Sequence, residues 1–204
     1  MRTLAIETAT EACSVALFEG EDLVAHDHRV LGRGHAERLV PMIAGLPDKG
    51  RADRILVSRG PGSFTGVRIG IATARALGIA WQAEVLGYPT LTMIYSQAAQ
   101  ISSRTVTACM NGGHGEWFIA DFAGDVAEPG MVSSLTPEQA VSRGAQELIA
   151  GNRAEEFAEL LGDGTPAIKL LPDARAALLM ADSCFTRDLS PIYGRGPDAK
   201  LPGQ

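Results

Sequence analysis

The sequence predicts an α/β protein with two lobes, and three observations carry this prediction. The first is at the N-terminus, where three apolar runs are joined by short polar turns, as in an antiparallel meander. The second is the order that follows, in which segments with helical spacing of apolar residues alternate with short apolar runs. The third is a fresh pair of strands after the boundary at 101–104. We therefore expect one lobe over 1–103 and a smaller one over 104–204.

The spacing of apolar residues defines each element in turn. The predicted strands, in chain order, are 2–8, 12–18, 23–31, 54–58, 84–87, 105–111, 116–122 and 146–150. The predicted helices are 35–46, 64–82, 90–100, 136–141, 153–161 and 173–185. Pro41 lies inside the first helix and is expected to kink it, whereas Thr136 and Pro137 form a helix start signal. The Pro/Gly-rich tail, about 186–204, is expected to pack back on the N-terminal lobe.

Composition narrows the class of protein. The chain is 46% hydrophobic and 21% charged, as soluble domains are. Its net charge of −6 argues against stand-alone nucleic-acid binding, because phosphates need clustered Lys and Arg. The three cysteines are far apart and form no CxxC pair, so we expect neither a disulfide framework nor a zinc site. A signal-peptide core and an apolar run of membrane length are both missing, and we expect a cytoplasmic protein without a membrane partner.

A glycine-rich stretch, "SRGPGSFTGVRIG" at 58–70, first suggests a phosphate-binding loop. A P-loop needs GxxxxGK followed by Ser or Thr, and no lysine follows these glycines. The dinucleotide fingerprint GxGxxG also fails, because Gly60, Gly62 and Gly66 are spaced one residue too widely. The stretch is better explained as a tight turn into a helix, with Ser63 as its N-cap.

Small residues recur every four positions along the helix that follows, at Gly66, Gly70, Ala74 and Gly78. Each glycine inside a helix lowers the stability of that helix by about 1 kcal/mol relative to alanine, so a favourable interaction must compensate for the stripe. Close approach of another backbone to the small residues supplies such an interaction through dispersion contacts. The residues alone leave three readings open, which are packing inside the lobe, a subunit interface and a ligand site. Arg68 and Arg75 lie on a different face of the same helix. This face is either exposed to solvent or in contact with an acidic partner surface.

Catalytic and metal residues are not recognisable in this sequence. His26 and His28 lie on one face of a strand, but no third metal ligand accompanies them, and a solvated edge strand explains them equally. A Ser-His-Asp or Cys-His set cannot be placed, and no GxSxG elbow exists. We therefore expect no catalytic residue and no metal ligand.

The first turn, "IETATEACS", resembles the first phosphate loop of the actin-like ATPase superfamily, in which an acid and hydroxyls meet a magnesium nucleotide. Glu7, Thr8 and Thr10 are then vestigial nucleotide contacts, with Ala9 where that loop has glycine. Alternatively, the hydroxyls simply bond their own turn.

Three motifs together carry a family resemblance. "LAIETATEACSVAL", "HAERLVPMI" and "SRGPGSFTGVRIG" resemble the TsaB (YeaZ) family over 2–94, which includes "GYPTL" at 87–91. The likeness is looser beyond, although "PIYGRGPDAK" at 191–200 is similar to the family's tail. The loop over 47–53 is short for the family. At Asn111, Gly112 and Gly113 an acid and an arginine common in relatives are gone, which puts their polar role in doubt.

The resemblance implies a shortened two-lobe actin-like, Hsp70-like ATPase fold (ribonuclease H-like), with mixed sheets flanked by helices. It implies a non-catalytic scaffold that supports TsaD. That enzyme transfers threonylcarbamoyl from threonylcarbamoyl-adenylate to N6 of the tRNA adenosine beside the anticodon, position 37. TsaD carries a His-x-x-x-His metal pair, whereas this chain has "GYPTLTMI" after the corresponding strand.

The implied partners are TsaD in a heterodimer, the ATPase TsaE in a ternary complex, a second copy when the chain is alone, and tRNA only indirectly. No cofactor of its own is implied, and ATP or ADP belongs to the complex. The alternatives are a nucleotide-binding module of the same superfold and, as the weakest, a glycoprotease-type peptidase. The residues expected at the interface with TsaD or a second copy are His35, Leu39, Met42, Ile43, Phe64, Gly66, Val67, Gly70, Ala74 and Gly78.

Overall fold

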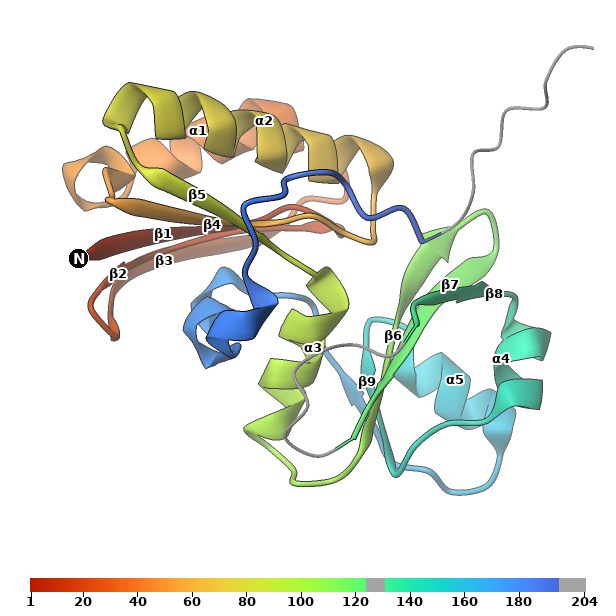
Figure 1. Ribbon diagram of the computed structural model, residues 1–204. Helices are drawn as coiled ribbons and strands as arrows, with labels where there is room; N and C mark the ends of the chain where they lie inside the picture. Colours follow the sequence, from red (N-terminus) through yellow and green to blue (C-terminus); the bar gives the residue numbers. More distant parts are fainter. Residues whose placement is uncertain (124–130, 195–204) are drawn as a thin grey trace, which may run out of the picture.

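The computed structural model describes residues 1–123 and 131–194. Within these ranges the chain forms two five-stranded mixed sheets, each flanked by helices (Figure 1). The predicted α/β class, with mixed sheets covered by helices, is confirmed.

The first sheet has the strand order β3-β2-β1-β4-β5. Its strands are β1 (Arg2–Glu7), β2 (Ala12–Glu19), β3 (Asp22–Val30), β4 (Arg54–Ser58) and β5 (Glu84–Tyr88). β1, β2 and β3 form the predicted antiparallel meander, while β4 and β5 run parallel to β1. This register brings Ser14 opposite both Glu7 and His28.

One face of the first sheet is covered by α1 (His35–Ala44) and α2 (Phe64–Trp81), with the 3-10 helix η1 (Pro47–Gly50) between α1 and β4 (Figure 1). α1 runs through Pro41 and ends two residues before the predicted end. The Ser63 side chain accepts a hydrogen bond from the Gly66 N–H at 3.2 Å, which confirms the predicted N-cap. The core between these layers consists of aliphatic side chains, among them Leu4, Ile6, Val15, Leu17, Leu39, Ile55, Val57 and Ile71.

The second sheet has the strand order β10-β9-β6-β7-β8. Its strands are β6 (Val106–Gly113), β7 (Glu116–Phe122), β8 (Ser133–Leu135), β9 (Leu148–Gly151) and β10 (Ala167–Lys169). It repeats the pattern of the first sheet, since β6, β7 and β8 pair antiparallel and β9 and β10 run parallel to β6. β8 and β10 were not predicted, because three residues are too few to show a strand period.

Three helices surround the second sheet. α3 (Thr90–Ala99) lies between the two sheets and packs on β6 and β9. α4 (Pro137–Arg143) and α5 (Ala154–Leu161) cover the outer face (Figure 1). The predicted start of α4 is confirmed, because Thr136 and Gln139 form a reciprocal capping box.

The prediction of one helix over 173–185 is wrong. The segment forms two 3-10 helices, η2 (Ala174–Leu179) and η3 (Asp182–Cys184), with Met180 in an extended conformation between them. Buried alanines of η2 lie against the inner face of the first sheet, together with Phe18 and Leu56. The short alanine side chains let this backbone approach the sheet closely, and packing therefore overrides helix propensity.

After η3 the chain continues along the edge of the first sheet. Thr186 and Gly87 exchange two backbone hydrogen bonds, and the Ile192 N–H donates to the Arg59 carbonyl at 2.7 Å. The second sheet and its helices therefore end near residue 170, and the chain returns to the first lobe earlier than the predicted tail. The part of that tail over 195–204 lies outside the described residues.

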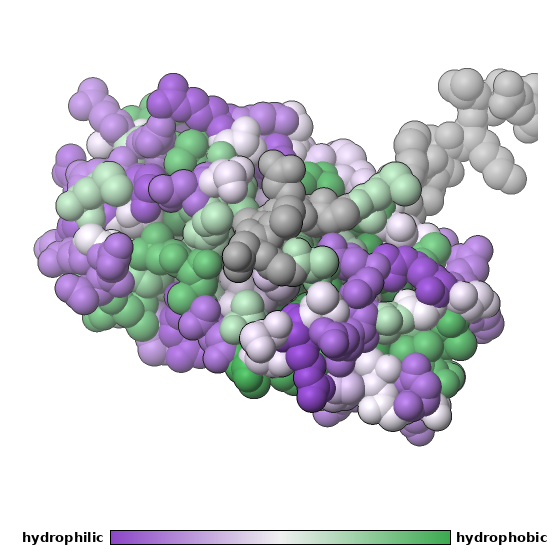
Figure 2. All heavy atoms as spheres, turned by 60° about the horizontal axis from the view of Figure 1, so that its bottom comes forward, coloured by the Kyte–Doolittle hydropathy of each residue, from purple (hydrophilic) through white to green (hydrophobic). Residues whose placement is uncertain are grey.

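The surface carries both polar and apolar side chains. Figure 2 shows one face, on which apolar side chains form separate groups among hydrophilic ones. None of the helices in the described ranges is long and apolar enough to cross a membrane.

Candidate functional site

A cleft of about 990 Å³ lies between the two lobes. One wall comes from the β1–β2 turn and the start of α2, and the other from the β6–β7 hairpin, with the C-terminal segment at the rim. The lining residues are Ala9, Thr10, Glu11, Gly32, Gly62, Ser63, Phe64, Arg68, Asn111, Gly112, Gly113, His114, Phe118, Asn152, Tyr193 and Gly194. The volume suits a small ligand or a segment of another chain.

Three side chains of this lining, Phe64, Arg68 and Tyr193, form what we call the aromatic–arginine platform. The guanidinium carbon of Arg68 lies 3.6 Å from the centre of the Phe64 ring. Arg68 Nη2 donates to the Tyr193 hydroxyl at 2.9 Å, and the two rings stack with centres 5.7 Å apart. Sequence reasoning missed Tyr193, since it lies far from α2 in the chain. Its only sequence signal is the "PIYG" motif of the tail.

The floor of the cleft ties the two lobes together. Asn152, which follows β9, donates through Nδ2 to both carboxylate oxygens of Glu11 at 3.1 and 3.0 Å. Its Oδ1 accepts from the Asn111 N–H at 2.9 Å. Asn152 thus joins the β1–β2 turn of one lobe to the β6–β7 hairpin of the other. No sequence pattern singles out Asn152 or Glu11.

The predicted nucleotide contacts separate in the structure. Glu7 is fully buried, with Oε1 accepting from the Ala9 N–H at 2.7 Å and Oε2 3.3 Å from the Tyr88 hydroxyl. Burial raises the pKa of the Glu7 carboxyl to about 7, and these hydrogen bonds offset only part of that effect. The Thr8 hydroxyl donates to the Gly66 carbonyl at 2.8 Å beneath α2. Only Thr10 lines the cleft, where its Oγ1 accepts from the Ala12 N–H.

The glycine stripe of α2 faces its own sheet. A Cβ atom at Gly66 or Gly70 would overlap Thr8, and one at Gly78 would overlap Val85. Ala74, the fourth member, is also fully buried. The interpretation of this stripe as a surface for another helix is therefore corrected, because close packing of α2 on β1 and β5 already uses it.

The same correction applies to most of the other predicted interface residues. Those that are buried inside the lobe, and so do not form a contact surface, are His35, Leu39, Met42, Ile43 and Val67. His35 Nε2 lies 3.1 Å from the Ala12 carbonyl. Phe64 alone of the predicted set is exposed, at 57%. The outer face of α1 and α2 instead exposes Val40 at 54% and Ile79 at 83%.

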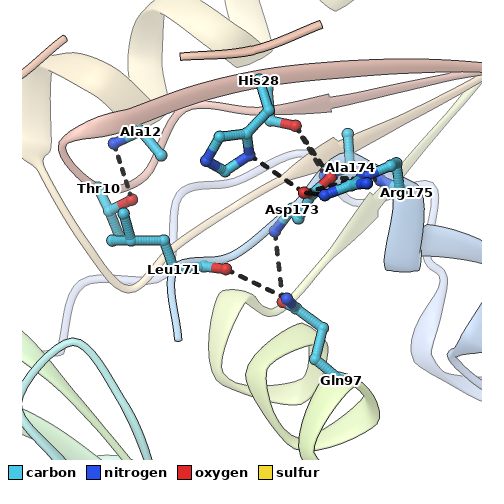
Figure 3. A network of polar contacts seen from close by, with 9 residues as sticks. Thr10, Ala12, His28, Gln97, Leu171, Asp173, Ala174 and Arg175 are labelled. Carbon is cyan, nitrogen blue, oxygen red and sulfur yellow. Dashed lines mark hydrogen bonds and ion pairs between the residues drawn. The ribbon is translucent and has the colours of Figure 1, made fainter. Parts of the chain in front are cut away.

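A second polar cluster fixes the returning chain to the meander (Figure 3). Asp173 accepts from the Arg175 side chain, with Oδ2 at 2.6 Å from Nη2, and lies 3.2 Å from His28 Nδ1. Ser14 Oγ donates to Asp173 Oδ1 at 3.3 Å and accepts from the Ala174 N–H. Burial opposes ionisation of Asp173, but its bonds with Arg175 and the nearby His28 outweigh this and lower its pKa.

This cluster contains a serine, a histidine and an aspartate, but not in the arrangement of a catalytic triad. Asp173 lies between the other two, whereas a triad needs the histidine beside the serine. Ser14 is fully buried, and its hydroxyl is engaged at both donor and acceptor. The cluster therefore has a structural role. Across residues 1–123 and 131–194, no group of three His, Cys, Asp or Glu side chains is placed to hold a metal ion.

Comparison with known proteins agrees with this fold. A family model described as TsaD, tRNA N6-adenosine threonylcarbamoyltransferase, matches residues 29–181. The chain is 38% identical to the tRNA threonylcarbamoyladenosine biosynthesis protein TsaB of Escherichia coli (strain K12), covering all of both proteins. It is 29% identical to TsaB of Haemophilus influenzae, covering 98% of this chain and 97% of that protein.

Solved structures extend the comparison. YeaZ from Pseudomonas aeruginosa superposes with a TM-score of 0.78 at 30% identity, covering 94% of this chain and 99% of that one. The ethanolamine utilization protein EutJ from Carboxydothermus hydrogenoformans shares the fold at a TM-score of 0.50 and 10% identity, covering 88% of each chain. Two lobes built on repeated mixed sheets around a cleft define a protein of the actin-like ATPase fold, as predicted. Within that class, the chain belongs to the TsaB (YeaZ) family.

Proposed function

We propose that this chain works in the cytoplasm in tRNA threonylcarbamoyladenosine biosynthesis, as a non-catalytic subunit that supports TsaD. In this role it assists transfer of threonylcarbamoyl from threonylcarbamoyl-adenylate to N6 of adenosine 37. The observation that carries the proposal is the match to Escherichia coli TsaB over the full length of both proteins. The non-catalytic part is supported by Glu7 and Ser14, which are buried and engaged rather than directed into the cleft.

The proposed partners are TsaD in a heterodimer, TsaE in the ternary complex, and a second copy of the chain when TsaD is absent. The outer face of α1 and α2 supports an interface, because it exposes the large apolar residues Val40 and Ile79 on neighbouring helices. Exposed apolar side chains of this size gain free energy when a partner covers them. tRNA is contacted indirectly, through the complex.

Reconstitution tests the proposed role. TsaD, TsaE, ATP, threonylcarbamoyl-adenylate and tRNA are combined with and without this chain, and modified adenosine is measured. We expect modification only when the chain is present, and no modification by the chain alone. Equal modification without the chain overturns the accessory role.

The interface is tested by a charge on the exposed face. Ile79→Asp on α2 should weaken co-elution with TsaD by about tenfold or more, since a desolvated carboxylate is costly at an apolar contact. Leu160→Asp on α5, which is also exposed (50%) but lies in the second lobe, is the matched control. Unchanged co-elution of the Ile79 variant contradicts this interface.

The alternative function is a nucleotide-binding module, with ATP or ADP bound by the chain itself or within the complex. The cleft between the lobes favours it, because Thr10 of the predicted phosphate turn lines that cleft. Calorimetry with ATP, ADP and Mg²⁺ distinguishes the two functions, and loss of binding in Thr10→Ala supports a site at this turn. The peptidase alternative is tested by casein digestion, for which we expect no cleavage.

A further inference from the structure

Arg68 carries a positive charge without a carboxylate partner among the described residues. It is held instead by the Phe64 ring face and by one hydrogen bond to Tyr193. Arg59 and Arg153 differ in this respect, since Arg59 pairs with Asp188 and Arg153 pairs with Glu156. A guanidinium has five N–H donors, so most of those on Arg68 remain for an anion in the cleft.

The two rings of the platform are exposed where aromatic side chains are usually covered. Phe64 is 57% and Tyr193 51% exposed, although both line the cleft. The residue next to each ring is hydrogen-bonded. Ser63 caps the helix beside Phe64, and the bond from Ile192 to Arg59 anchors the chain beside Tyr193. A rigid, half-exposed ring offers a flat face on which a planar group stacks at little entropic cost.

Polar groups on the floor suit hydroxyls rather than a metal-bound triphosphate. Thr10 and Asn111 supply a hydroxyl and an amide group to the same cleft, whereas both amide atoms of Asn152 are already hydrogen-bonded. Glu11 is already bonded to Asn152, and Glu7 is buried away from the cleft. Magnesium with a triphosphate needs carboxylate ligands and several cations, and the described lining offers a single guanidinium. The cleft therefore suits a ligand that has a planar ring, hydroxyl groups and one phosphate.

We propose that the aromatic–arginine platform binds a nucleoside monophosphate unit without a metal ion. The base stacks on the exposed face of Phe64 or Tyr193, and the phosphate accepts hydrogen bonds from Arg68. The unit is either a free nucleotide or an unpaired residue of an RNA. The RNA source rests on the proposed function, whereas the ring-and-phosphate chemistry rests on the platform alone.

Calorimetry on the full chain tests the proposal with AMP, adenosine, inorganic phosphate and ATP with and without Mg²⁺. Fluorescence anisotropy with a labelled single-stranded oligoribonucleotide tests the RNA source. We expect AMP to bind more tightly than adenosine or phosphate, with no Mg²⁺ dependence. Binding only of the oligoribonucleotide assigns the unit to RNA, and binding only of AMP assigns it to a free nucleotide. Either supports the platform.

Matched variants locate the binding. Arg68→Met keeps an apolar stem over Phe64 but removes the charge, and should weaken binding about tenfold or more. Tyr193→Phe keeps the ring and should bind nearly as well, whereas Tyr193→Ala loses a stacking face and should also weaken binding about tenfold. Arg75→Met, exposed on α2 but outside the cleft lining, is the control.

Three outcomes overturn the proposal. They are no binding of AMP or oligoribonucleotide at millimolar concentration, equal binding of AMP and adenosine, and undiminished binding by Arg68→Met. Binding of ATP that requires Mg²⁺ also overturns it and favours the alternative nucleotide module. Reconstituted tRNA modification is a separate measurement, so a failure here leaves the accessory role standing.

Discussion

Two buried carboxyl groups in the first lobe respond to their surroundings in opposite ways. Burial raises the pKa of Glu7 to about 7, because none of the described cations pairs with it and its hydrogen bonds are too few to compensate. Asp173 is also buried, yet Arg175 and His28 hold its pKa below the usual value. The presence of a paired cation decides the difference. The two groups therefore make the stability of the folded protein depend on pH in opposite directions.

Glu7 should make the protein less stable as pH rises. Its pKa is higher in the folded chain than in the unfolded one, so folding retains a proton between pH 4.5 and about 7. The free energy of unfolding falls across this window by about 3 kcal/mol. Glu7→Gln should remove that fall, as measured by urea unfolding at several pH values. Glu37→Gln, an exposed change on α1, is the control. A constant difference between wild type and Glu7→Gln at all pH values contradicts this account.

Asp173 should have the reverse effect. Because the pKa of Asp173 is lowered in the folded chain, the stability that its charge contributes is fully present at pH values above the usual carboxyl range. This stability is lost as the pH falls through the pKa of the folded state. Asp173→Asn leaves Arg175 and His28 without their anion, and should cost about 1–3 kcal/mol at pH 7. Asp188→Asn is the comparison, since the Asp188 side chain of the pair with Arg59 is exposed to solvent. Equal unfolding free energies for wild type and Asp173→Asn at pH 7 rule out this role.

At the scale of elements, α2 depends on the absence of side chains at its glycines. Gly70→Ala improves helix propensity by about 1 kcal/mol, but the new Cβ would overlap the Thr8 hydroxyl. We expect a net loss of about 1–3 kcal/mol, as in other overpacked cores. Thermal unfolding measures it, with the exposed Ala72→Ser on the same helix as control. A stabilised Gly70→Ala protein shows that α2 does not need this close approach.

The elements with strong periodicity were predictable and the others were not. The meander, α2 and α3 follow from apolar spacing, whereas β8 and β10 are too short to show a period. The alanine-rich η2 looks helical in sequence, and only its burial on the first sheet explains its form. The site shows the same limit. Thr8 pairs with Gly66, and Tyr193 with Arg68, across separations that no local pattern encodes.

At the scale of the whole molecule, Asn152 sets how the lobes meet. Asn152→Asp keeps the oxygen that accepts from Asn111 but places a second carboxylate within about 3 Å of Glu11. We expect a cost of about 1–3 kcal/mol at pH 7 that disappears as one carboxyl is protonated at low pH. Unfolding followed from pH 4 to 8 measures it. Asn152→Ala, which loses both bonds without adding charge, should show no such pH dependence.

The position of η2 also determines when the first lobe is completed during translation. Its alanines and Met180 cover a face of the first sheet that includes Ala5, Ala16 and Leu56. That face stays open on the ribosome until about 85 further residues have followed β5, so the N-terminal lobe finishes after the second one. A nascent chain arrested before residue 170 is expected to remain protease-sensitive within 1–103. A chain carrying an added C-terminal linker, long enough to bring residue 194 out of the ribosome, should become resistant there, because η2 leaves the ribosome late and completes the lobe that left first.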